Sequence, residues 1–436
     1  MSLRVQQMLG YTLLSAAFFI GFFHRFAPAT FAEPIARTFD VGSTALGGLA
    51  SMQFWVYTLM QIPAGVIVDR YGIRVPASVG TALVGIGAAV LALAPSFALA
   101  MCGPALVGFG MSIVFVSVMK NNAIWFTGQR FGFITGCTLL TAAMGSIASE
   151  APAALLLRIS AWQPIFLALS VLSLILAALL ASFWRPPPAE DCGQLTARNK
   201  KERTKIFGTI RSVIARPQIW LIMLAISGTN GTFYAFAGLW GTPLLVHSFG
   251  FERDTAALAM TLSLVPYGLG SLFLGQISDK LRTRKAFIIA ASGASTVAWV
   301  WLVSAGSATP VVAWICFVLL GLSSSQVVAS FAAVKESVPD EATGTALSLV
   351  NMGVFLTTAI VQFGYGWLVA SAGTGSTITG DLYRIALWLP AAISIAGLLG
   401  ALKVSETFPR EQHQNQPANT QMAIRGQLQP PYRDGD

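Results

Sequence analysis

Long apolar runs recur along almost the whole chain of 436 residues, each bounded by charged residues, prolines or glycines. A helix needs about 20 consecutive apolar residues to cross the hydrocarbon core of a bilayer. Hydrophobic residues make up 55% of the chain and charged residues 10%, against the ~25% charged that is typical of soluble domains. This composition argues against a soluble protein and predicts an all-α membrane protein with twelve transmembrane helices.

The runs fall into two sets of six, separated by the longest polar stretch inside the chain. They lie near 8–34, 44–67, 76–95, 97–120, 131–157 and 162–184, and near 217–247, 255–277, 286–306, 310–334, 343–370 and 382–403. This order predicts an N-terminal six-helix bundle (1–184), a cytoplasmic linker (185–216), a C-terminal six-helix bundle (217–404) and a disordered cytoplasmic tail (405–436).

Two short motifs occur once in each half at nearly the same offset. The first has Gly65, Asp69 and Arg70 in one half, and Gly275, Asp279 and Lys280 210 residues later. The second, Thr-Gly followed by Met-Gly, starts at Thr135 and again 208 residues later at Thr343. Duplicated six-helix halves imply a pseudo-twofold axis along the membrane normal, with a substrate site between them near the midplane.

The basic residues divide unequally between the two sides of the membrane. Alternate loops place 22 Lys and Arg residues on one side, with both termini, and 5 on the other. Because Lys and Arg are retained in the cytoplasm, both termini are predicted to be cytoplasmic in an inner-membrane protein. The net charge of +9 is therefore topological, and we expect no nucleic-acid partner. The four cysteines show no disulfide or metal spacing, and neither a metal nor a cofactor is expected.

The stretch between the second and third runs carries a recognisable signature. It reads Gly65-Val-Ile-Val-Asp69-Arg70-Tyr71-Gly72-Ile73-Arg74. This stretch resembles the G-x-x-x-D-[RK]-x-G-R-[RK] signature of the major facilitator superfamily, and the resemblance covers residues 8–404. The second copy keeps its charges but has Arg282 in place of the middle glycine. The resemblance implies a transporter that works by alternating access, with two halves that rock around a central site.

The signature residues are candidates for a conformational latch. We expect Gly65 to permit close helix approach and Gly72 to form a tight turn. The full set of latch candidates is Gly65, Asp69, Arg70, Gly72 and Arg74 in the first copy, and Gly275, Asp279, Lys280 and Arg284 in the second. The alternative is that the basic residues only set the topology.

Within the superfamily, the chain most resembles the sugar-phosphate and organic-anion permeases, including the anion:cation symporters. The resembling stretches are Phe23-His24-Arg25, Gln61-Ile62-Pro63-Ala64-Gly65, and Lys120 before Trp125-Phe126. The resemblance implies that Arg25 and Lys120 bind the anionic group of a substrate. A charge within hydrocarbon is costly, which favours such a role for Arg25; the alternative is a side chain that reaches the outer interface.

Polar residues inside the runs give further candidates for substrate binding. Gln53, Tyr57 and Gln61 follow each other at i, i+4 and i+8 and form a polar ladder on the second run. Weaker candidates in the C-terminal half are Asn230, Tyr234, Gln326 and Asn351. The alternative for all of these residues is a polar contact between helices.

Coupling to protons requires a side chain that can change its charge. Apart from Asp69 and Asp279 at the cytoplasmic ends and Glu33 at the edge of the first run, Glu150 is the one carboxylate within a predicted span, and His24 is the other candidate. The alternative for Glu150 is a carboxylate at a helix end that faces water. The alternative for His24 is a neutral histidine packed between helices.

These features predict a monomeric secondary transporter in the lipid bilayer. Its expected activity is proton-coupled uptake of a small organic anion, such as a carboxylate or sugar acid. One alternative is an exporter of a metabolite, siderophore or drug, and another is a transporter-like sensor. An enzyme is not expected, because the sequence shows neither a cluster of His, Cys and carboxylates nor a nucleotide-binding loop.

Overall fold

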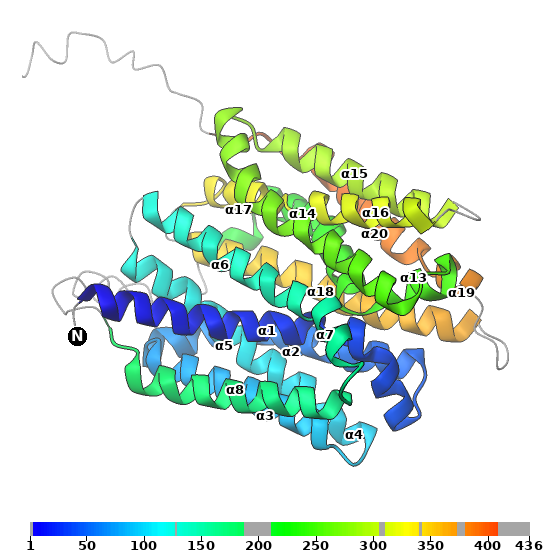
Figure 1. Cartoon of the computed structure of the whole chain (residues 1–436). Helices are drawn as coiled ribbons and strands as arrows, with labels where there is room; N and C mark the ends of the chain where they lie inside the picture. The colour runs from blue at the N-terminus through cyan, green and yellow to red at the C-terminus, as the bar shows by residue number, and fades with distance from the viewer. Residues whose placement is uncertain are drawn as a thin grey trace, which may run out of the picture.

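The computed structural model describes residues 3–126, 129–186, 211–304, 310–339, 342–372 and 380–408. Every regular element in these ranges is a helix (Figure 1). A helix satisfies its backbone hydrogen bonds within one segment, which hydrocarbon demands of any spanning chain. The predicted all-α architecture is confirmed.

Six predicted spans make up the N-terminal half, two of them interrupted. The helices are α1 (Leu3–Phe39), α2 (Ser43–Tyr71), α3 (Arg74–Leu93), α4 (Phe97–Ala100), α5 (Cys102–Trp125), α6 (Gln129–Ala148), α7 (Ala151–Leu156) and α8 (Trp162–Phe183). The fourth span is divided into α4 and α5, and the fifth into α6 and α7. The break in the fifth span lies at Ser149 and Glu150, so it places a carboxylate at the start of α7.

The C-terminal half contains more irregular helices. Its elements are α11 (Pro217–Ile226), η2 (Ser227–Gly231), α12 (Thr232–Ala235), η3 (Phe236–Trp240), α13 (Gly241–Phe249), α14 (Arg253–Lys280), α15 (Lys285–Ser304), α16 (Pro310–Ser324), α17 (Val327–Glu336), α18 (Thr343–Ala372), α19 (Gly380–Ile385) and α20 (Trp388–Lys403). The segments η2 and η3 are π-helical turns within one long helix. Such π-turns are frequent at functional sites.

Eleven helical segments in the described ranges are long and apolar enough to cross a membrane. The predicted second span, α2, is outside this set, although its 29 residues extend about 44 Å. It packs against α5 of its own half and against α18 of the other half. The contacts between α2 and α18, α6 and α14, and α1 and η3 form the seam between the halves (Figure 1).

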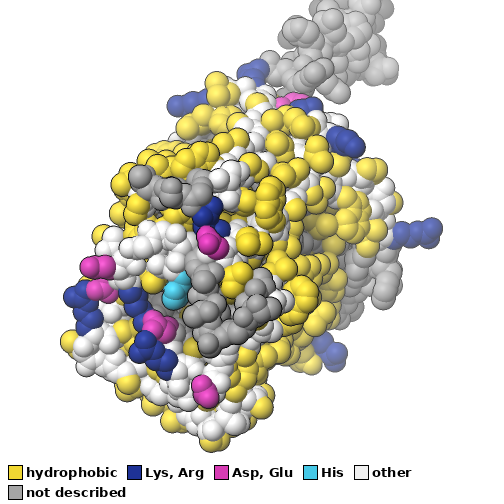
Figure 2. Space-filling model, turned by 90° about the vertical axis from the view of Figure 1, so that its right-hand side faces the viewer, with side chains coloured by type: hydrophobic (Ala, Val, Ile, Leu, Met, Phe, Trp, Pro, Cys, Tyr) yellow, Lys and Arg dark blue, Asp and Glu magenta, His cyan; other side chains and the backbone are white. Residues whose placement is uncertain are grey.

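Ion pairs and hydrogen bonds join the two halves at one end of the seam, which we call the ion-pair end. Arg253 Nη1 lies 2.5 Å from Glu33 Oε2, and Arg158 pairs with Asp254. Ser43 Oγ also donates to the Gly366 carbonyl at 3.3 Å. Figure 2 shows acidic and basic side chains gathered on this end. Exposed pairs each contribute less than about 1 kcal/mol, so these ion pairs add little to the stability of this closed end.

The signature loops lie at the other end of the helices, which we call the signature end. Gly72 has φ +76°, which confirms the predicted turn, and Arg282 adopts φ +51° at the matching place. The expectation for Gly65 is wrong, because a Cβ added there would meet no atom within 4 Å. A Cβ on Gly275 would lie 2.9 Å from Val328 Cγ1, so the close approach occurs in the second copy.

Two alanine substitutions separate these roles. Gly72→Ala should lower the free energy of unfolding by about 1–2 kcal/mol, because an L-residue is strained at positive φ. Gly65→Ala, in open space on a helix, should be neutral or stabilising by up to about 1 kcal/mol. Thermal unfolding of the purified protein in detergent measures both, and equal destabilisation by the two variants would contradict this assignment.

The first residues of the predicted tail are not free of the fold. Glu406 accepts hydrogen bonds from Thr283 Oγ1 at 2.6 Å and from the backbone N–H groups of Arg284 at 2.9 Å and Lys285 at 3.3 Å. Partial burial opposes ionisation of Glu406, but these hydrogen bonds outweigh it and lower its pKa to about 2. Residues 405–408 therefore hold the second signature loop, and the expectation of disorder is wrong for them.

Candidate substrate site

Arg25 is buried between the two halves of the molecule. It lies on α1 about 6 Å beyond the midpoint of that 37-residue helix, towards the ion-pair end. Its side chain is 2% exposed, and its Nε and Nη2 atoms have no hydrogen-bond partner among the described residues. The alternative in which the Arg25 side chain reaches the outer membrane interface is therefore wrong, because the guanidinium remains within the protein.

Aromatic rings from both halves surround this guanidinium. Its central carbon lies 4.5 Å from the ring of Phe22 and 4.7 Å from that of Tyr57 in the N-terminal half. It lies 4.4 Å from the ring of Phe355 on α18 in the other half. Ring faces attract a cation, but they leave the N–H groups of Arg25 available to an anion.

Close helix contact fixes the place of Arg25. A Cβ added to Gly238 in η3 would lie 3.3 Å from the Arg25 carbonyl oxygen and 3.0 Å from Gln362 Nε2. The absence of a side chain at Gly238 therefore lets the backbone of η3 approach α1, and a larger residue there would push the halves apart.

The C-terminal half contributes a polar cluster next to these rings. Tyr234 and Tyr267 share a hydrogen bond at 2.7 Å between their hydroxyl oxygens. The ring of Tyr234 lies 5.8 Å from that of Phe26 and 6.0 Å from that of Phe355. Because Arg25 lies over the same Phe355 ring, this cluster belongs to the same site.

Two amide side chains behind Tyr234 have oxygens that accept no hydrogen bond from described residues. Asn230 and Gln326 are fully buried. Asn230 Nδ2 donates to the Ser324 carbonyl at 2.7 Å, and Gln326 Nε2 donates to Thr229 Oγ1. Because a carbonyl can only accept, and Thr229 already donates to a carbonyl, these bonds fix which way each amide points. The site therefore presents acceptors, which suit the hydroxyl groups of a ligand.

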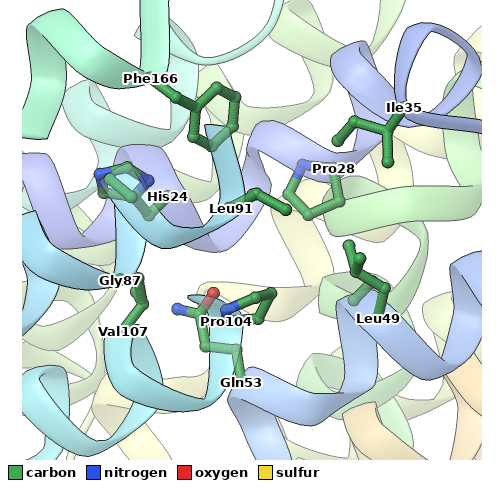
Figure 3. A pocket seen from close by; sticks show the side chains of 12 residues that line it. His24, Pro28, Ile35, Leu49, Gln53, Gly87, Leu91, Pro104, Val107 and Phe166 are labelled. Carbon is green, nitrogen blue, oxygen red and sulfur yellow. The ribbon is translucent and has the colours of Figure 1, made fainter. Parts of the chain in front are cut away.

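His24 and Gln53 lie away from Arg25, inside the N-terminal half. Both line a cavity of about 20 Å³ with Pro28, Leu91 and Phe166 (Figure 3). The Nε2 atoms of His24 and Gln53 have no partner among the described residues, and Pro28 cannot donate to the His24 carbonyl. The cavity is large enough for one water molecule, which would suit these polar groups.

The other predicted binding residues are spread along the seam. Gln61 is 2% exposed, and both polar atoms of its amide lack partners among the described residues. Asn351 Nδ2 is likewise unpartnered on α18, one turn before Phe355. Lys120 Nζ donates to the Val68 carbonyl at 3.1 Å, which directs it towards the signature end of α2. The structure thus brings Tyr57 and Tyr234 to Arg25 but does not bring Lys120 to it.

Glu150 lies at the break between α6 and α7, close to the seam. It is fully buried; its Oε2 accepts a hydrogen bond from Thr30 Oγ1 at 3.3 Å, and its Oε1 has no partner among the described residues. The carbonyl of Thr30 accepts from Arg253 Nη2 at 2.9 Å, and the N–H of Ala151 donates to Thr261 on α14. This carboxyl group therefore shares its neighbours with the contacts that join the halves, and the water-facing alternative is wrong.

The latch candidates contact helices of their own half. Arg74 Nε donates to the Ala181 carbonyl on α8 at 2.6 Å, and Arg284 Nη2 lies 3.0 Å from Glu336 Oε1 on α17. Arg70 stacks over the ring of Tyr71. Lys280 ends α14, and the side chains of Asp69 and Asp279 lie outside what the structure describes. These contacts hold each signature loop to its own bundle.

Sequence reasoning missed several residues of the site. Phe54 and Phe355 lie beside Arg25, and Tyr267 shares a hydrogen bond with Tyr234. All three lie in long apolar runs, where the sequence does not distinguish an aromatic residue of the site from one that faces lipid. The one available signal was the polar hydroxyl of Tyr267 beside Pro266, in the middle of a span.

Comparison with known proteins decides the family. The family model described as "Major Facilitator Superfamily" matches residues 13–242 and 231–431. The chain belongs to the major facilitator superfamily. Members of this superfamily are membrane transporters, and this chain is accordingly a multi-pass membrane transporter.

Relatives and solved structures agree with this placement in the superfamily. A putative tartrate transporter of Agrobacterium vitis is 22% identical over 91% of this chain and 91% of its own length. A probable sulfoacetate transporter of Cupriavidus necator is 22% identical over 64% of this chain and 66% of its own length, just under two thirds. An inward-facing bacterial homologue of the lysosomal transporter Spinster superposes with a TM-score of 0.71 at 15% identity, covering 91% of this chain and 96% of that one. The fold of the superfamily is thus shown, and two of these relatives are named as transporters of organic anions.

Proposed function

We propose that this transporter takes up a small organic anion, with the carboxylate of the substrate bound to Arg25. The observation that carries the proposal is a buried guanidinium that makes no ion pair with any described residue. An unpaired charge in the protein interior costs several kcal/mol, and a bound anion removes that cost. The relatives named for tartrate and sulfoacetate, both organic anions, support this class of substrate.

The acceptors of the C-terminal half favour an acid that also carries hydroxyl groups. Asn230 Oδ1 and Gln326 Oε1 lack donors, and a buried acceptor without a partner costs about 1–3 kcal/mol. Hydroxyl groups of a sugar acid would supply those donors while its carboxylate occupies Arg25. Lys120, Gln61 and Asn351 line the route to the signature end in this proposal.

The proposed coupling ion is the proton, carried by Glu150. Its oxygens receive a single hydrogen bond from described residues, so proton binding would neutralise a charge that has little other compensation. Separation of the halves at the ion-pair end, the outer end in this proposal, would let Glu150 take up a proton. The proton would be released when the signature end opens to the cytoplasm. His24 is a second proton site in this proposal. The signature loops stabilise each half as the two halves rock. The transporter is a monomer in the inner membrane, with both termini in the cytoplasm.

A panel of six-carbon ligands tests this assignment. The purified protein should be stabilised against heat by aldonates such as gluconate, less by hexanoate, which lacks hydroxyls, and not by sorbitol, which lacks the carboxylate. Gln326→Leu should weaken aldonate binding about tenfold, ~1.4 kcal/mol, and leave hexanoate binding within about twofold. Failure of every carboxylate would overturn the proposed substrate class, whereas equal binding of hexanoate and aldonates would remove only the hydroxyl assignment.

A further inference from the structure

A groove lies between α14 and α16 at the ion-pair end. The two helices touch at Ser263 and Gly321, where a Cβ on the glycine would lie only 1.9 Å from the Ser263 carbonyl oxygen. Between this contact and the first turns of both helices lies a groove of about 450 Å³. Ser263 is ten residues beyond the start of α14, so the groove reaches about 15 Å along the helix.

The groove is apolar and faces the lipid. Leu258, Leu262 and Val311 line it and are 48%, 39% and 60% exposed. All three lie on segments that are long and apolar enough to span the membrane. In a bilayer, the molecules next to such surfaces are lipids, and an acyl chain is the matching shape for a long apolar groove.

Two polar groups in the groove require a more specific occupant than a hydrocarbon chain. Trp314, one turn into α16, lines the groove, and its indole N–H is buried without an acceptor among the described residues. Glu252 lines the mouth of the groove and is exposed, and the described residues form no ion pair with it. The neighbouring acids Glu33 and Asp254 are paired with arginines.

We propose that the groove binds one phospholipid with a primary ammonium headgroup, of the phosphatidylethanolamine type. One acyl chain fills the groove between α14 and α16, an oxygen of the glycerol ester region accepts the Trp314 N–H, and the ammonium group pairs with Glu252. Tryptophan is enriched where membrane proteins cross the membrane–water interface, because its ring is apolar and its N–H is polar. A quaternary choline cannot donate a hydrogen bond to the carboxylate, and an anionic headgroup is repelled by it.

Native mass spectrometry of the delipidated full-length protein tests this site. The probes are phosphatidylethanolamine, phosphatidylcholine and phosphatidylglycerol with identical acyl chains at equal concentration. The wild type should retain the ethanolamine lipid at least about fivefold better than the glycerol lipid, a difference of ~1 kcal/mol. Glu252→Gln should reduce this preference to less than about twofold, while Trp314→Phe, which keeps the ring, should weaken binding of all three lipids.

The matched control is Asp40→Asn, which removes another exposed carboxylate at the same end, outside the groove. It should leave the lipid preference unchanged, and thermal unfolding should confirm that all three variants fold. Equal retention of the three lipids by the wild type would show ordinary lipid contact and overturn the proposal. An unchanged preference in Glu252→Gln would overturn it as well.

Discussion

Arg25→Gln should abolish binding of the organic anion while the protein still folds. Replacing the guanidinium removes the one charge that meets the substrate carboxylate, and charged hydrogen bonds of this kind contribute about 3 kcal/mol, or at least 100-fold in affinity. The variant should be as heat-stable as the wild type without ligand, or more stable, because a buried and unpaired charge is also lost. Thermal unfolding with and without the tightest-binding aldonate measures both effects.

Arg4→Gln provides the matched control for this prediction. Arg4 lies on the same helix and is exposed, so its replacement should change neither ligand binding nor stability. Ligand stabilisation that survives intact in Arg25→Gln would remove Arg25 from the substrate site, whatever the anion is.

Glu150→Gln should uncouple transport from the pH gradient. A one-unit gradient supplies ~1.4 kcal/mol per proton, enough to accumulate a substrate about tenfold. Glutamine preserves the shape of Glu150 and its contact with Thr30 but cannot release a proton. The variant should therefore exchange labelled substrate across the membrane yet accumulate none, so its final ratio of inside to outside concentration should approach one.

Asp40→Asn is the control here too, since it removes an exposed carboxylate at the ion-pair end. Accumulation in this variant should match that of the wild type. If Glu150→Gln still concentrates its substrate tenfold, the proton is carried elsewhere, and His24→Gln becomes the next variant to assay.

The spans could be predicted from the sequence because hydrocarbon leaves few options for the backbone. The apolar runs predicted all twelve spans, and eleven helical segments in the described ranges are long and apolar enough to cross a membrane. The breaks at Ser149–Glu150 and the π-turn of η2 could not be predicted, since tertiary packing decides them and no proline or glycine pair marks them uniquely. The turn at Arg282 could not be predicted either, because this position has a positive φ but carries arginine in place of the glycine that usually marks such a turn.

Residues of the candidate site could be predicted only where a charged or polar side chain stands within an apolar run. Arg25 stands out because a charge in an apolar run needs an explanation. The ladder on α2 was only half right: steps of four residues rotate about 40° each, so Gln53 and Gln61 point about 80° apart. Gln53 therefore faces the cavity beside His24, while Tyr57 faces Arg25.

Uptake into sealed proteoliposomes tests the central claim most directly. With an alkaline interior, the wild type should concentrate the labelled aldonate that binds most tightly, and a protonophore should collapse the gradient of substrate. Arg25→Gln vesicles should behave like vesicles without protein. Entry of the label no faster than into protein-free vesicles, or equal accumulation by Arg25→Gln, would contradict a proton-driven carrier that binds its anion at Arg25.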